Sequence, residues 1–156
     1  MTHHDIREER IDTLNELISV TKDSAKFYGD AASEANNPQL QSLFRSMADS
    51  KNDIVGALSR EVRSEGAEPD KQGSFSGSLH RLYGEVRGKL GSDDYAYVSQ
   101  LEASEDRMLD AYCDVLKDND TPQPVKSVVS EYLPKVTAQH DLMRDQKWRM
   151  ESSSSH

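Results

Sequence analysis

Two ionisable residues of this chain, Glu105 and His140, occupy positions where the surrounding helical pattern calls for apolar side chains. Apolar residues recur around both at steps of three and four, the spacing of a helix face that packs inside a bundle. Carboxylates and imidazoles are ligands of divalent transition metals. Asp49 and Asp53, in an earlier helical segment, offer further carboxylates. These four residues are the candidate ligands of one divalent cation, such as iron, and no catalytic or cofactor-binding residue is predicted.

A structural role for the same residues is the favoured interpretation. An unpaired buried carboxylate is costly, so Glu105 is expected to pair with His140 or with Lys51. His140 on its own is more often a hydrogen-bonded core histidine than a ligand. A pair with Glu105 would raise the pKa of His140 and make it a possible pH-sensitive element.

Four long amphipathic segments must position these side chains. The first runs from about Ile6 to Ala35 and is stopped by the sequence Asn36, Asn37, Pro38, which suits a tight turn and a restarted helix. The second ends near Gly66 and has a polar gap at residues 50–52. Because the first connection is short, the first two helices should be antiparallel.

The second half of the chain repeats this arrangement. Ser92 is the expected N-cap of the third helix, which reaches a turn at residues 118–124. The fourth helix starts at Val125 and contains Pro134, which removes a backbone hydrogen bond and should bend it. Residues 1–150 are predicted to form one domain, and residues 151–156 a disordered tail.

The two halves are joined by a stretch with a different composition. Residues 66–78 are rich in Gly, Pro and Ser and are predicted to form a long crossover loop. A short amphipathic helix follows over residues 79–90. Two antiparallel helical hairpins joined by a long crossover define the expected fold, an all-α four-helix bundle of the ferritin-like class.

Composition restricts the function further. The formal net charge of −9 over 156 residues disfavours phosphate backbones, so no nucleic acid partner is expected. No apolar run approaches the roughly 20 residues needed to cross a bilayer, and Cys113 is the only cysteine. A cytoplasmic protein without a membrane partner is predicted.

Several short motifs carry a resemblance to a known family. They are Leu14-Asn15-Glu16-Leu17-Ile18, Gly77-Ser78-Leu79-His80-Arg81, Glu105-Asp106 with Tyr112, and Ala138-Gln139-His140-Asp141. Together they resemble a bacterial family of small ferritin-like four-helix proteins of unknown function. The resemblance implies an up-down-down-up helix arrangement and a cytoplasmic, stress-associated role.

A complete ferritin-like di-metal centre takes one Glu from each of two helices and Glu-x-x-His from each of the other two. This sequence contains no Glu-x-x-His, because Thr137 stands three residues before His140. The predicted function is therefore a non-catalytic scaffold or interaction protein with a degenerate metal site, for which no cofactor is expected. The alternative is an iron-handling or oxidase-like carboxylate protein that uses Glu105 and His140. If the chain associates, a two-fold homodimer is expected, since that symmetry is commonest.

Overall fold

The computed structural model describes residues 3–69 and 93–154, and within these ranges every regular element is a helix. The helices are α1 (His3–Glu34), α2 (Pro38–Ser64), α4 (Asp94–Lys117) and α5 (Gln123–Ser154). The predicted all-α four-helix bundle is confirmed. The short helix expected over residues 79–90, and most of the loop before it, lie outside the described residues.

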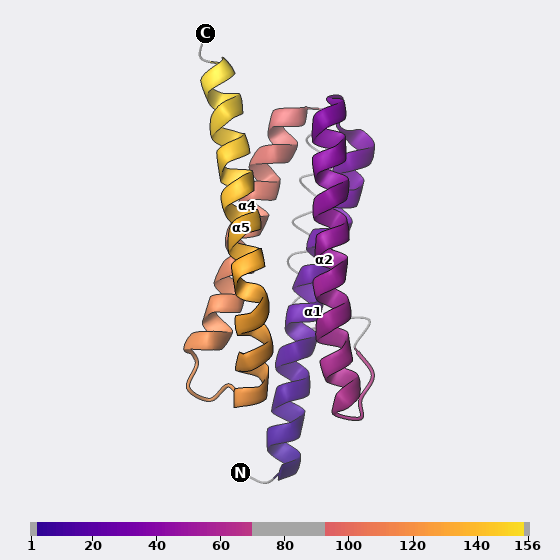
Figure 1. The fold of residues 1–156 in the computed structure, drawn as a ribbon, viewed down its shortest axis with the longest axis vertical. Coiled ribbons are helices and arrows are strands. Elements are labelled where there is room, and N and C mark those ends of the chain that lie inside the picture. The colour runs from indigo at the N-terminus through magenta and orange to yellow at the C-terminus, as the bar shows by residue number, and fades with distance from the viewer. Residues whose placement is uncertain (1–2, 70–92, 155–156) are drawn as a thin grey trace.

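The helices form two antiparallel pairs. α1 packs along α2, and α4 packs along α5 (Figure 1). α4 begins at the same end of the bundle as α2, so α2 and α4 run one way while α1 and α5 run the other (Figure 1). This is an up-down-down-up order. None of the helices in the described ranges is both long and apolar enough to cross a membrane.

The turn between α1 and α2 is fixed by side chains that accept backbone hydrogen bonds. Asn37 is the N-cap of α2, in an extended rather than a left-handed conformation, and its side chain accepts from the backbone N–H of Gln39 and Leu40. Asp94 accepts from the backbone N–H groups of Asn36 and Asn37, at 2.7 and 2.9 Å. The start of α4 is thereby tied to the α1–α2 turn.

Helix ends lie within a few residues of those expected from the sequence. α2 ends in a Schellman motif, in which Gly66 takes a φ of 81° and donates to the carbonyl of Arg63. The N-cap of α4 is Asp93, not Ser92, because the Asp93 carboxylate accepts from the N–H of Ala96. α5 continues to Ser154, so residues 151–154 of the expected tail are helical.

The core consists of two apolar clusters, one toward each end of the bundle. Residues 14–20 of α1, 54–62 of α2, 108–112 of α4 and 125–136 of α5 supply the first cluster. The second cluster takes residues 27–35 of α1, 40–48 of α2, 97–101 of α4 and Met143 of α5. Between these ranges, each helix has a short central stretch that belongs to neither cluster. Polar side chains meet there.

Candidate functional site: a polar layer in the bundle core

Lys51 lies at the centre of the bundle. It occupies the seam of α2 defined by Phe44, Met47, Ile54 and Leu58, all buried, and its own side chain is fully buried. The sequence pattern alone predicts a polar interruption of this helix at residues 50–52. Lys51 instead keeps the seam spacing and points into the core.

Glu105 is the counter-charge of Lys51. Its side chain is fully buried, and its carboxylate lies 2.9 Å from the Lys51 Nζ. The Tyr28 hydroxyl donates a second hydrogen bond to Glu105 Oε1 at 2.6 Å. Of the two partners considered for Glu105, the structure therefore selects Lys51, and α1, α2 and α4 meet at one carboxylate.

Gln139 completes the contact from the fourth helix. Its Oε1 accepts from Lys51 Nζ at 2.7 Å, and its Nε2 donates to Ser50 Oγ at 2.6 Å. We call Tyr28, Ser50, Lys51, Glu105 and Gln139 the polar layer. Every helix of the described bundle contributes at least one side chain to it.

The polar layer is an electrostatically self-contained unit. Burial lowers the pKa of Lys51 below its ordinary value, while the charge of Glu105 and its hydrogen bond oppose that shift. Loss of hydration makes a buried charge expensive unless its partners replace the water. Here Glu105 and Gln139 provide oxygen acceptors to the amine. A metal ion at the Glu105 carboxylate would compete with the contacts from Lys51 and Tyr28.

A second buried polar contact lies beside the layer, within the first apolar cluster. Thr21 Oγ1 donates to the carbonyl of Leu17 at 2.6 Å, so the Tyr112 hydroxyl is the donor in its 2.7 Å contact with Thr21. Burial raises the pKa of Tyr112 above its ordinary value. Tyr112 therefore stays protonated in the folded protein.

His140 lies outside the polar layer. Gln139 takes the buried seam position of α5, and the His140 ring is only partly buried. Its Nε2 contacts Asp106 Oδ1, and its Nδ1 lies 3.0 Å from Asp141 Oδ1. Burial alone would lower the pKa of His140, but the hydrogen bonds to Asp141 and Asp106 together raise it. The sequence suggests Glu105 as the partner of His140. In the structure, His140 instead contacts two aspartates at the surface.

The four ligand candidates from the sequence are thus distributed over different environments. Glu105 is in the core, His140 is at the edge of the α4–α5 contact, and Asp49 and Asp53 are exposed on α2. Within the described ranges, one group of three His or acidic side chains has ligand atoms that all lie within 4.8 Å of one another: Glu102, Asp106 and His140. Only His140 of the predicted set belongs to that group.

The sequence predicts Lys51 as a possible partner of Glu105 but not its place in the apolar seam of α2, and it does not single out Gln139. A detectable signal existed for Lys51, because it continues the three-and-four spacing of α2 and its charge is opposite to that of Glu105 on a facing seam. For Gln139 the signal was weaker. Either Gln139 or His140 fits the α5 spacing, and only the rotation of the helix distinguishes them.

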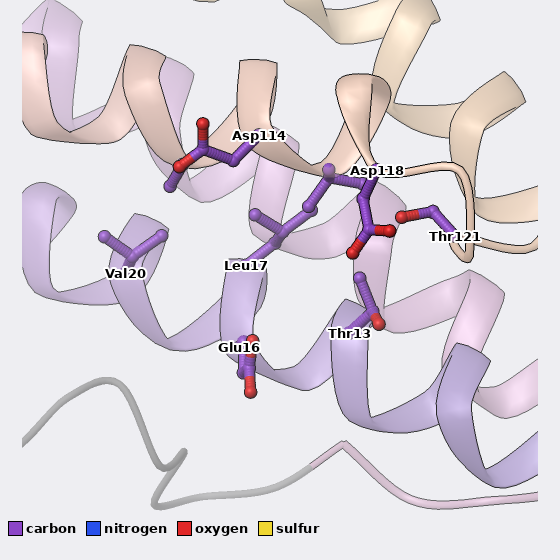
Figure 2. Close-up of a pocket in the computed structure, with 9 residues that line it drawn as sticks. Thr13, Glu16, Leu17, Val20, Asp114, Asp118 and Thr121 are labelled. Atoms are coloured by element: carbon purple, nitrogen blue, oxygen red, sulfur yellow. The ribbon is translucent and has the colours of Figure 1, made fainter.

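A hollow of about 210 Å³ lies between α1 and the end of α4 and shares no residue with the polar layer. Leu17, Val20 and Val115 form apolar walls. Figure 2 shows the carboxylates of Asp114 and Asp118 on the α4 side of this hollow, and Glu16 on α1.

Comparison with known protein families gives a match. A family model described as "Domain of unknown function (DUF2383)" matches residues 9–118. No curated protein and no solved structure matches the chain. The matched region contains Tyr28, Ser50, Lys51 and Glu105, whereas Gln139 and His140 lie beyond it on α5. Since the match spans more than half of the sequence, this chain belongs to the DUF2383 family.

Proposed function

We propose that this protein is a non-catalytic bundle of ferritin-like architecture that acts through its surface as a scaffold or interaction protein. In bundles that bind metals, the ion is held in the core by side chains from facing helices. The observation that carries the proposal is the position of the Lys51 amine, which lies between the two apolar clusters and contacts Glu105 and Gln139. A lysine there supplies internally the positive charge that a bound cation would bring.

The up-down-down-up order of the helices supports the ferritin-like assignment. The family resemblance supports a cytoplasmic, stress-associated role, and the single cysteine fits a reducing compartment. Survival of a strain that lacks this protein, measured under oxidative and nutrient stress, tests that role. Cell fractionation tests the location.

The test of the core is anaerobic loading with Fe(II), followed by desalting and iron analysis. His140→Ala protein is used beside the wild type, so that iron held near the surface histidine is recognised. We expect the Glu105→Gln protein to retain as much iron as the wild type. One or two tightly bound irons per chain, retained in His140→Ala and lost in Glu105→Gln, would refute the proposal.

An iron-handling protein that uses Glu105 together with His140 is the alternative. It receives less support, because the two side chains have separate partners: Lys51 and Tyr28 for Glu105, Asp106 and Asp141 for His140. Oxidation of Fe(II) that falls in both Glu105→Gln and His140→Ala would restore it.

A further inference from the structure

Three potential metal ligands converge at the contact between α4 and α5. Glu102 and Asp106 lie one helical turn apart on α4, and His140 faces them from α5. One ligand atom of each lies within 4.8 Å of those of the other two. An ion can therefore contact all three side chains at once after small rotations.

The histidine is held in the way that metal-binding histidines are held. His140 Nε2 faces Asp106, while Nδ1 contacts the carboxylate of Asp141 at 3.0 Å. A carboxylate on the second ring nitrogen fixes the tautomer and orientation of a ligating imidazole and makes it a better donor to the metal. Asp141 is not one of the three converging ligands, so this support comes from outside the group.

The site is reachable from solvent but not fully exposed. Glu102 and His140 each keep 16% of their side-chain surface, and Asp106 keeps 52%. The cation nearest to Glu102 is the Lys147 Nζ at 3.8 Å, a loose contact that a bound ion can replace. Arg144 contacts Asp141 rather than the three ligands. Two carboxylates then give the site a local negative charge.

We propose that Glu102, Asp106 and His140 bind a borderline divalent transition metal of the zinc type, with solvent completing the coordination. One nitrogen and two oxygen ligands fit such an ion, whereas calcium and magnesium prefer oxygen ligands alone. Binding joins α4 to α5 near the middle of both helices. The site shares no residue with the polar layer. The proposal does not rest on the function proposed above for the protein.

The experiment uses the full chain with His140 as its only histidine. The other histidines are replaced by alanine: His3, His4, His80 and His156. Zn²⁺ is titrated calorimetrically, and the His140 ring nitrogens are followed by NMR. We expect one equivalent of zinc to bind, with a shift of the Nε2 resonance.

Variants in the same background assign the ligands. His140→Ala and Asp106→Asn should each weaken zinc binding at least tenfold, as losses around metal sites do. Asp110→Asn, an exposed carboxylate on the same helix, is the matched control and should leave affinity unchanged. Circular dichroism verifies that each variant folds.

The proposal fails if the single-histidine protein binds no zinc at millimolar concentration, or if His140→Ala binds as tightly as its parent. Binding that is lost in Glu105→Gln but retained in His140→Ala would also refute it, and would at the same time contradict the self-contained core. Loss in His140→Ala alone supports the site and leaves the proposed function intact.

Discussion

Glu105 illustrates how a single buried charge depends on its neighbours. Its carboxylate is fully buried and contacts the Lys51 amine and the Tyr28 hydroxyl. Such a pair contributes little net stability relative to well-packed apolar residues, because both ions give up their hydration. Removal of one partner is far more damaging, since the other charge then stays buried without compensation.

Lys51→Met should therefore lower the free energy of unfolding by about 3–5 kcal/mol, the usual cost of breaking a buried pair. Urea titration of the purified chain measures the change. Lys22→Met, an exposed lysine on α1, is the control and should stay within about 0.5 kcal/mol of the wild type. The double variant Lys51→Met/Glu105→Leu should recover most of the loss. A Lys51→Met cost no larger than that of Lys22→Met would contradict this account.

Tyr112 gives a prediction for alkaline pH. Burial raises its pKa in the folded protein, so above the ordinary tyrosine value of 10.0 the unfolded chain loses this proton while the folded chain keeps it. Folding stability contributed by Tyr112 is complete below pH 10 and falls as the pH rises, by about 1.4 kcal/mol per pH unit for one proton. Between pH 9 and 11, Tyr112→Phe should lose stability less steeply than the wild type. The free energy of unfolding is measured by denaturant titration at each pH. If it falls equally steeply with pH in both proteins, the folded state does not raise the pKa of Tyr112.

At the scale of the element, α5 is the helix whose sequence departs furthest from an ideal helix. It runs without interruption from Gln123 to Ser154 although Pro134 lies inside it. A proline there lacks the N–H needed for the backbone hydrogen bond and crowds the preceding turn. The packing of α5 against α4 outweighs that cost. Pro134 itself is exposed, so its replacement alters no buried contact.

Pro134→Ala should raise the free energy of unfolding by up to about 3 kcal/mol, because alanine restores the missing hydrogen bond. Thermal and urea unfolding both measure this. Glu131→Ala, an exposed change one turn earlier, should alter stability by no more than about 0.5 kcal/mol. A destabilised Pro134→Ala protein would mean that the local geometry imposed by the proline is needed for the packing of α5.

At the scale of the molecule, two helical hairpins are held together by two apolar clusters and the polar layer between them. Apolar seams alone tolerate several relative positions of the helices. A buried polar contact tolerates few, because a shift by one turn would leave Lys51 and Glu105 unpaired. We infer that the polar layer fixes the register of the four helices, a role that buried polar groups have in coiled coils.

The whole molecule is also the scale at which assembly is decided. A two-fold dimer is expected, since closed two-fold symmetry is the commonest form of association. Sedimentation equilibrium should then give twice the chain mass of 17.5 kDa. A mass of one chain across the micromolar range would exclude the dimer.

The sequence alone determined the features that depend on local chemistry. The periodic apolar residues located all four long helices, Asn37, Pro38 and Gly66 marked their ends, and Glu105 stood out as a charge inside a seam. Each of these follows from interactions between residues close together in the chain.

Tertiary structure decided which side chains meet. Lys51 and Glu105 are 54 positions apart, and their contact exists only because the two hairpins pack with these seams facing each other. A rotation of α5 by one residue would exchange Gln139 for His140 in the core, and no local signal specifies that rotation. The packing of α5 as a whole against its neighbours fixes it, and Val136, Gln139 and Met143 are buried together. His140 is thereby left at the surface beside Asp106.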